Sequence, residues 1–346
     1  MSLCPFWLKA DSREPTALPG FIGGADLENP FPKVILRMTH SDSAGPLVVG
    51  LGEALFDRFG DVAVLGGAPI NFAVHANQLM AVRGGRGAVA TRIGDDELGQ
   101  RLTRELDARG LALDALQVDP QAPTGVVEVT LDDDGQPSYD IRAGAAWDQL
   151  QFDDAWQSLA GSCQAVCFGT LAQRTATSRA AIHAFLAAAP QALRLCDLNL
   201  RPPHYDNEVI RASLAAANAV KLNEDELQLV AELMKLSAGS SADAQMFELM
   251  KECDLQAAIL TRGAEGTAVF RGERWHAAPP PPLSREPDAD AVGAGDACGA
   301  AATCGLLAEW PLEQIVELAN AAGGFVASRQ GATPELPAEL KQRLAS

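Results

Sequence analysis

The sequence predicts an α/β protein with a doubly wound, mostly parallel sheet that is covered by helices on both faces. From residue 47 onward, short apolar runs of strand length alternate with helical segments, which is the order of repeated βαβ units. In addition, 47% of the 346 residues are hydrophobic, which is enough for the core of one large domain or two smaller ones. In folds of this class, ligands bind outside the carboxyl ends of the strands.

The predicted strands are short apolar runs bounded by turn residues, and the predicted helices lie between them. The strands cover residues 47–52, 86–93, 165–168, 193–196, 219–222, 257–260 and 267–270. The helices cover residues 68–82, 95–109, 178–189, 224–233, 244–252, 294–308 and 312–328. Two β-like runs, 125–131 and 136–143, flank an Asp-Asp-Asp-Gly sequence and predict a hairpin that interrupts the alternation. The prolines at 279–282 and 287 predict an edge or a loop before residue 290.

Composition argues against several classes of function. The net charge of −18 and the lack of a basic run argue against a nucleic-acid partner. The seven cysteines are scattered and lack zinc-like spacing, which is typical of free thiols in a reducing compartment. No signal-peptide pattern is present, and the long apolar run at 291–308 is rich in Ala and Gly, so we expect a cytoplasmic protein with no membrane partner. Residues 1–46 hold six prolines without a sustained apolar period and predict a loosely ordered tail.

That apolar run contains one ionisable acid, Asp296, directly behind a Gly-Ala-Gly turn that opens a helix. Burial disfavours the charged form of this carboxyl, while helix N-terminal amides favour it, so it is suited to accept a proton. The free amides of Ala294, Gly295 and Asp296 form a pocket for phosphate oxygens. A base beside an anion hole is what phosphoryl transfer to an alcohol requires. A purely structural helix cap explains the same pattern equally well.

Seven motifs then occur in one order along the chain: GEALFD (52–57), GGAPINFA (66–73), IGDDELG (93–99), DLNLRPPHY (197–205), KLNEDEL (221–227), LTRGAEG (260–266) and DAVGAGDA (290–297). From residue 47 to the C-terminus the chain thereby resembles the ribokinase-like (PfkB) sugar kinases, most closely their fructokinase branch. The resemblance implies ATP-dependent phosphorylation of the primary hydroxyl of a sugar, fructose first, with Mg²⁺. It also implies one kinase domain over residues 47–346, with a small β lid over the sugar from about 58–65 and 124–143.

The resemblance further implies roles for individual residues. Asp296 acts as the general base, and the amides of Gly293, Ala294 and Gly295 complete the anion hole. The sugar site takes Asp57, Gly66, Gly67, Asn71, Arg142, Arg174 and Arg201. The nucleotide site takes Asn199, Asn223, Thr261, Gly263, Gly266 and Asn320. Glu226 acts near magnesium through water, and Asp290 lies near a site for a monovalent cation such as K⁺.

Most of these residues also have a plain structural interpretation. Asp57 can be a solvated acid at a strand end, and Gly66-Gly67 can be an ordinary strand-to-helix turn. Arg201 can belong to a salt bridge. Asn223 and Glu226 can form a helix cap, since Asn followed by Glu three residues later is a capping pattern. His75, one helical turn after Asn71, is better explained as a packed core histidine than as a ligand.

The chain departs from the family pattern at two positions near Asp296. Ala291 stands where a Thr is usual, which leaves cation activation open, and Cys298 replaces a usual Phe. The alternatives within the enzyme class are 2-keto-3-deoxygluconate, ribose or a nucleoside as the substrate. A sugar-binding regulator without turnover is the alternative in another class, and an NAD-dependent oxidoreductase is disfavoured because no G-x-G-x-x-G follows the first strand. Dimers that pair through the lid are frequent in the family, so a homodimer is open.

Overall fold

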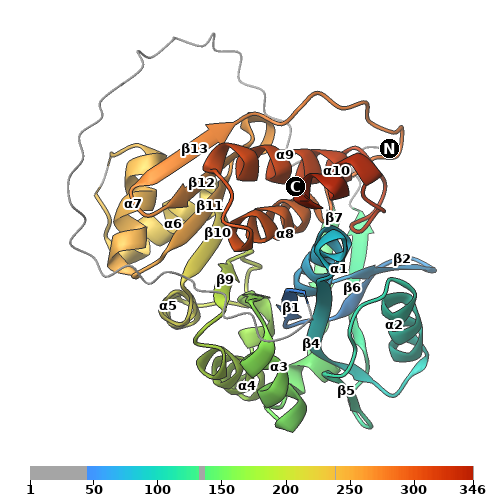
Figure 1. Cartoon of the computed structure of the whole chain (residues 1–346). Helices are drawn as coiled ribbons and strands as arrows, with labels where there is room; N and C mark the ends of the chain where they lie inside the picture. Colours follow the sequence, from blue (N-terminus) through green and yellow to red (C-terminus); the bar gives the residue numbers. More distant parts are fainter. Residues whose placement is uncertain (1–44, 132–136, 238, 346) are drawn as a thin grey trace.

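The computed structural model describes residues 45–131, 137–237 and 239–345. Its main sheet has nine strands in the order β13-β12-β11-β10-β9-β8-β1-β4-β5 (Figure 1). A second sheet has four strands in the order β3-β2-β6-β7. The predicted tail up to residue 44 and the predicted hairpin turn at 132–135 lie outside the described residues.

Each strand belongs to one of the two sheets, and helices occupy most of the connections between the strands of the main sheet. The main sheet consists of β1 (Leu47–Leu51), β4 (Arg86–Gly94), β5 (Leu116–Asp119), β8 (Ala165–Phe168), β9 (Leu193–Asp197), β10 (Ala219–Asn223), β11 (Ala257–Thr261), β12 (Thr267–Arg271) and β13 (Arg274–Ala278). The second sheet consists of β2 (Leu55–Phe59), β3 (Val62–Gly66), β6 (Gly125–Leu131) and β7 (Pro137–Ile141). The helices are α1 (Ala68–Met80), α2 (Glu97–Ala108), α3 (Asp154–Ser162), α4 (Ala176–Ala188), α5 (Asn207–Ala216), α6 (Glu224–Met234), α7 (Ala242–Glu252), α8 (Ala294–Leu307), α9 (Leu312–Ala327) and α10 (Ala338–Gln342).

Alternating side chains of the strands fill a separate core on each face of the main sheet. Val49 of β1 and Phe168 of β8 belong to the core that α3, α4, α5, α6 and α7 cover. Val48 and Cys167 point to the opposite core, which α1, α8, α9 and α10 cover. Because strands buried on both faces read as continuous apolar runs, the sequence showed them clearly. The doubly wound α/β fold is therefore confirmed (Figure 1).

Several smaller elements were not predicted, namely β5, β13, α3, α5 and α10. The helices among them are short, and Asp153 and Asp206 cap α3 and α5. The edge strand β13 has the exposed Trp275 and no buried residue, so it lacks the apolar signal of the inner strands. The proline-rich segment that follows β13 up to residue 290 contains no strand or helix, as its prolines predict.

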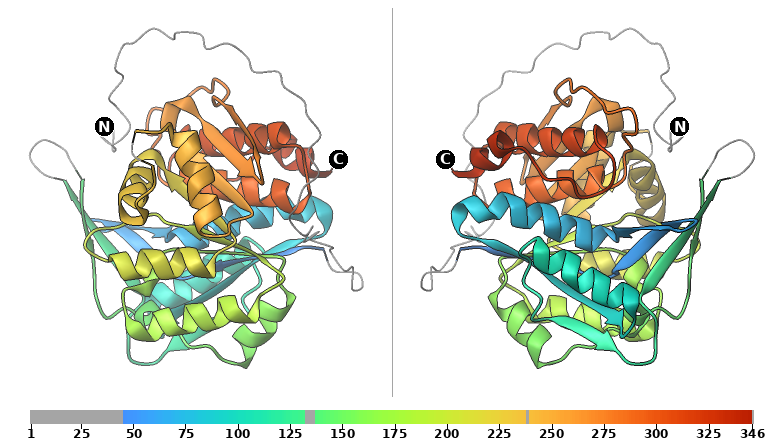
Figure 2. Two further views of the ribbon diagram at one scale, coloured as in Figure 1. Left: turned by 90° about the vertical axis from the view of Figure 1, so that its left-hand side faces the viewer. Right: turned by 90° about the vertical axis from the view of Figure 1, so that its right-hand side faces the viewer.

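The order of the main sheet determines where a ligand can bind. β1 lies between β8 and β4 and pairs with both in parallel. The chain continues from β1 to β4 on one side, whereas β8 and the strands that follow it lie on the other side, so the strand order reverses at β1. A doubly wound sheet has its crevice at such a switch point, outside the carboxyl ends of the strands. The second sheet starts directly after β1 and extends beyond the layers of helices (Figure 2). In the part of the chain that the structure describes, no helix is long and apolar enough to span a bilayer.

Candidate active site

The first turn of α8 carries Asp296 toward the switch point. Gly293, the N-cap, has a φ of 77°, and a Cβ there would lie 2.4 Å from the carbonyl oxygen of Ala332, so only glycine fits. Asp296 is half-buried, and its Oδ2 accepts a hydrogen bond of 2.8 Å from Nδ2 of Asn71 in α1. The helix start and the buried Asn71 together fix the position of this carboxylate.

Free amides surround Asp296, as the sequence predicts, with one exception. The N–H groups of Gly293, Gly295 and Asp296 donate to no acceptor within residues 45–131, 137–237 and 239–345. The N–H of Ala294 donates to the carbonyl of Ala291 at 3.3 Å, so the prediction of a free amide was wrong at Ala294. The amide of Ala294, which the motif assigns to the anion hole, is instead used in the turn that leads into α8. Three donors at the positive end of α8 remain available for an anion.

The surroundings of Asp296 favour proton uptake near neutral pH. Burial raises the pKa of Asp296 to about 6, and the negative charge of Asp197 adds to the increase. Lys221, Asn71 and Arg201 oppose this increase because they stabilise the ionised form. A carboxyl with a pKa of about 6 is ionised at pH 7 and still basic enough to take a proton from an alcohol during reaction.

The sugar side of the site is built from β2, β3 and the start of α1. Asp57 of β2 is half-buried, and its carboxylate makes no hydrogen bond to any residue that the structure describes. A Cβ at Gly66, on the neighbouring β3, would lie 2.6 Å from Oδ2 of Asp57, so the glycine makes room for this side chain. Gly67 caps α1 at a φ of 101°. Oδ1 of Asn71 is buried without a partner, which leaves one acceptor for a ligand.

Sequence reasoning missed Glu53, although this residue lies in the GEALFD motif. Its side chain is 3% exposed at the carboxyl end of β1, and Oε2 has no hydrogen-bond partner. Burial raises the pKa of Glu53 to about 7, and the Asp296 carboxylate contributes to the increase. Glu53, Asp197 and Asn199 line a small cavity of about 10 Å³. The available signal was a lone acid inside an apolar run, the same signal that marks Asp296.

The DLNLRPPHY segment follows β9 and reaches over the site. Asn199 adopts a left-handed φ of 39°, which is uncommon outside glycine and often occurs at functional sites. Arg201 is exposed and makes no ion pair with the described residues, so the salt-bridge interpretation does not hold there. Burial raises the pKa of Asp57 to about 6, and the positive charge of Arg201 opposes this increase, as it does at Glu53 and Asp296. One guanidinium therefore acts on all three carboxyls.

Asn223 and Glu226 form a capping box at the start of α6. Oδ1 of Asn223 accepts from the N–H of Glu226 at 2.8 Å, and Oε2 of Glu226 accepts from the N–H of Asn223 at 2.9 Å. Oε1 of Glu226 also accepts from the N–H of Leu200 at 2.8 Å and thereby holds the loop after β9. The structural interpretation of this pair is correct, and the carboxylate keeps further lone pairs for water.

The residues predicted at the nucleotide lie around the ends of β11 and β13. Thr261 ends β11, and Gly263 has a φ of 56°. Gly266 has a φ of 89°, and a Cβ there would lie 2.0 Å from the carbonyl oxygen of Ala278. The same oxygen accepts from Nδ2 of Asn320 in α9 at 2.6 Å. The turn after β11 and the last long helix therefore meet at Ala278.

Asp290 joins the loop before α8 to the loop after α9, and His75 of α1 contacts the same loop after α9. Oδ1 of Asp290 accepts from the N–H of Val292 at 3.0 Å, and Oδ2 accepts from the N–H of Gly331 at 3.1 Å. His75 is fully buried, and its Nε2 lies 2.9 Å from the carbonyl oxygen of Ala332. Burial lowers the pKa of His75 to about 4, so the ring is neutral at pH 7. His75 is a packed core residue, as expected.

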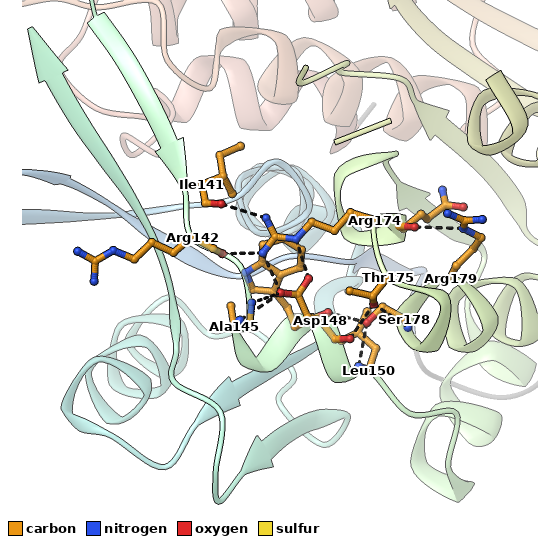
Figure 3. A network of polar contacts seen from close by, with 12 residues as sticks. Ile141, Arg142, Ala145, Asp148, Leu150, Arg174, Thr175, Ser178 and Arg179 are labelled. Carbon is orange, nitrogen blue, oxygen red and sulfur yellow. Dashed lines mark hydrogen bonds and ion pairs between the residues drawn. The ribbon is translucent and has the colours of Figure 1, made fainter. Parts of the chain in front are cut away.

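Two of the three arginines predicted at the sugar site, Arg142 and Arg174, have partners within the protein (Figure 3). Arg174 pairs with both carboxylate oxygens of Asp148, at 2.7 and 2.8 Å, and its guanidinium lies 3.9 Å from the centre of the Trp147 ring. It also donates to the carbonyl oxygens of Ile141 and Arg142, at 3.2 and 2.6 Å. The side chain of Arg142 points away from this network and pairs with Glu128 of β6. Both residues are thus engaged within the protein, and their contacts with a sugar stay predictions.

Comparisons with known proteins identify a family and related chains. The family described as pfkB family carbohydrate kinase matches residues 60–339. A fructokinase of Escherichia coli is 29% identical over 309 residues, which cover 83% of this chain and 95% of that protein. Fructokinase-2 of Oryza sativa subsp. japonica is 27% identical over 318 residues, which cover 84% of this chain and 91% of that protein.

Solved structures share the fold. The fructokinase with bound ATP from Xylella fastidiosa has a TM-score of 0.74 at 22% identity, covering 86% of this chain and 97% of that chain. An aminoimidazole riboside kinase from Salmonella enterica has a TM-score of 0.68 at 22% identity, covering 87% of this chain and 100% of that chain. The family match over most of the chain, together with the shared fold, leads to one conclusion: this chain belongs to the pfkB family of carbohydrate kinases.

Proposed function

We propose that the protein is an ATP-dependent sugar kinase that converts fructose to fructose 6-phosphate. The observation that carries this proposal is the half-buried Asp296, held by Asn71 beside the free amides of Gly293, Gly295 and Asp296 itself. The assignment of fructose is supported by the curated relatives, of which those from Escherichia coli and Oryza sativa are named fructokinases.

The proposed reaction begins with sugar hydroxyls that donate to the unpartnered carboxylate of Asp57 and to Oδ1 of Asn71. Asp296 then accepts the proton of the 6-hydroxyl. The sugar oxygen forms a bond to the γ-phosphorus of ATP while the bond from that phosphorus to the β,γ-bridging oxygen breaks, and ADP leaves. The amides of Gly293, Gly295 and Asp296, together with Arg201, stabilise the charge on the transferred group.

Magnesium fits this site if it arrives with the triphosphate. The described residues hold no group of three or more His, Cys, Asp or Glu side chains that could hold a metal ion by themselves. Mg²⁺ commonly keeps several waters and binds through substrate phosphates and one or two carboxylates, and Glu226 keeps lone pairs for such a water. When bound, the ion would neutralise charge on the β- and γ-phosphates. At the Asp290 loop, K⁺ would be held by main-chain carbonyls together with the lone pairs that the carboxylate of Asp290 keeps beside its two amide contacts.

We propose that the second sheet acts as the lid, with Asp57 at its base, and that the kinase domain covers residues 47–346. A lid keeps water from the γ-phosphate, which prevents wasteful ATP hydrolysis. We further propose a cytoplasmic homodimer that uses no nucleic acid or membrane. Its described cysteines form no disulfide, which suits a reducing compartment. Light scattering on the purified protein tests the dimer.

The proposal is tested by measuring ADP release with Mg²⁺ and a panel of sugars, with and without K⁺. The panel contains fructose, 2-keto-3-deoxygluconate, ribose and a nucleoside, because an aminoimidazole riboside kinase shares the fold. We expect the highest kcat/KM with fructose. A higher value with another sugar would overturn fructose and keep the kinase. Tight binding of a sugar without ADP release from any panel member would instead indicate a binding protein.

A further inference from the structure

Lys221 is a buried ammonium for which sequence reasoning gave no role. It lies in β10, is 7% exposed, and faces Asp197 in the register of the neighbouring β9. Its Nζ donates to both carboxylate oxygens of Asp197, at 2.9 and 2.8 Å. A buried charge is costly to desolvate even when it is paired. Because apolar residues would pack here at lower cost, this ion pair calls for an explanation other than stability.

Two glycines of α8 give Lys221 its path to the active site. A Cβ at Gly295 would lie 3.4 Å from Nζ of Lys221, and a Cβ at Gly299 would lie 3.1 Å from its Cδ. These glycines are four residues apart and therefore share one face of the helix. The lysine stem crosses that face and carries its ammonium to the first turn of α8, next to Asp296. Two of the three ammonium donors reach Asp197, which leaves one for the surroundings.

The charges around Asp296 come from several elements, and Lys221 is the one buried cation among them. Asp197 of β9 and Glu53 after β1 are acids, Arg201 is exposed in the loop after β9, and Asn71 of α1 is neutral. Burial favours the neutral form of Lys221, but Asp197 and Asp296 outweigh burial and raise its pKa. Lys221 in turn lowers the pKa of Asp296, whereas Asp197 raises it. The two charges of the ion pair therefore have opposite effects on the pKa of Asp296, the proposed base.

We propose that Lys221, clamped by Asp197 and passing across Gly295 and Gly299, is a positioning residue that keeps Asp296 ionised at the start of α8. Arg201 is exposed and can move with the loop after β9 or with a ligand, whereas the buried ammonium of Lys221 is held in place by Asp197. The inference rests on the proposed function, because it gives Asp296 the role of proton acceptor.

The kinetic test compares the pH dependence of kcat/KM, which reports the free enzyme, in K221M, D197N and the double variant. K221M removes the cation and should move the acid limb of the profile to higher pH by roughly one unit, since a nearby opposite charge changes a carboxyl pKa by about 1–3 units. Removing the Asp197 charge should move the limb down. The double variant replaces the ion pair by neutral groups, which keeps the fold if K221M alone unfolds, and its limb should lie between those of the single variants. A shift in the same direction in both single variants, or no shift, overturns the proposal.

A matched control is R92M, which breaks the ion pair between Arg92 and Asp119, at 2.9 Å and with side chains that are 12% and 9% exposed. This pair joins β4 to β5 away from Asp296. R92M should lose stability while its acid limb stays that of the wild type. An equal shift of the limb in R92M would show that any buried ion pair has this effect, and would overturn a specific role for Lys221.

A second readout needs no turnover. The difference in free energy of unfolding between a protein and its D296N variant, measured by urea from pH 4 to pH 8, reports the pKa of Asp296. The raised pKa means that ionisation of Asp296 destabilises the fold as pH rises toward about 6. In the K221M background this change should extend to higher pH. If no sugar is phosphorylated but the change still shifts, the proposed function fails and the role of Lys221 stands. If the enzyme is active but the change does not shift, the proposed role of Lys221 fails and the proposed function stands.

Discussion

Replacing Asp296 by Asn keeps the shape of the side chain and removes its ability to accept a proton. We expect kcat to fall by about 10²-fold or more, because a positioned general base commonly contributes that much. The KM for the sugar should change little, since Asp57 and Asn71 hold the sugar in the proposed arrangement. Steady-state kinetics with fructose measure both constants. A kcat within a few-fold of the wild-type value would remove Asp296 from the mechanism.

The same residue determines how activity depends on pH. Because burial raises the pKa of Asp296 to about 6, protonation below that pH removes the base. The wild-type kcat/KM should therefore fall on the acid side with a midpoint near pH 6, because this ratio reports the pKa of the free enzyme. This limb is the reference for the shifts expected in K221M and D197N.

Glu53 provides a prediction about stability. Burial raises its pKa from 4.5 to about 7, so the unfolded chain releases this proton at a lower pH than the folded protein. The free energy of unfolding should therefore fall as pH rises from about 4.5 to about 7, by about 3 kcal/mol. The Gln side chain of E53Q cannot ionise, so the free energy of unfolding of this variant should lack this decrease with pH. Urea unfolding at pH 5 and pH 8 measures the difference, and exposed Glu273, changed to Gln, is the control. Equal pH dependence in E53Q and the wild type would contradict the prediction.

At the scale of the element, the start of α8 depends on Gly293. Its φ of 77° strains any side chain, and a Cβ would also collide with the carbonyl of Ala332 at 2.4 Å. We expect G293A to lose about 2–3 kcal/mol and to lower kcat, because the free amides move with the helix start.

Gly84 gives a matched control for this variant, since its φ is 69° and a Cβ there meets no atom within 4 Å. G84A should lose only the cost of the left-handed backbone, about 1–2 kcal/mol, and keep its kcat. Thermal unfolding and steady-state kinetics separate the two effects. If G293A and G84A behaved alike, the contact with Ala332 would not fix the helix start.

At the scale of the whole molecule, Arg174 in the segment after β8 joins the end of the second sheet to the short helical segment that contains Asp148. It donates to the carbonyls of Ile141 and Arg142 at the end of β7 and pairs with Asp148 below (Figure 3). R174M should release this end of the lid, which we expect to raise the KM for the sugar several-fold and to increase ATP hydrolysis without sugar. An ADP-release assay with and without fructose measures both.

Arg179 is the control for this variant because it donates to Gln173 within the same region and not to the second sheet. R179M should retain the wild-type KM and ATP hydrolysis. If R174M changed the preference among sugars without increasing ATP hydrolysis, Arg174 would contact the sugar directly, as the family resemblance suggests. The lid attachment would then be a secondary role.

The sequence by itself determined the doubly wound fold and singled out Asp296 as the candidate base. Strands buried on both faces appear as continuous apolar runs, and a lone acid in an apolar run is visible without any partner, so both signals are local. The order of the motifs added the family. The small elements β5, β13 and α3 escaped because short or exposed segments carry little periodicity.

Only the tertiary structure decided how the site is assembled. Asn71 and Asp296 are 225 residues apart, and no local pattern indicates that they form a hydrogen bond. The same holds for Arg174, whose partners lie at the end of the second sheet and beside Trp147. It also holds for Lys221, which passes across two glycines of another element, α8. A side chain's chemistry is set by the groups that folding brings within a few ångströms, and those groups come from distant parts of the chain.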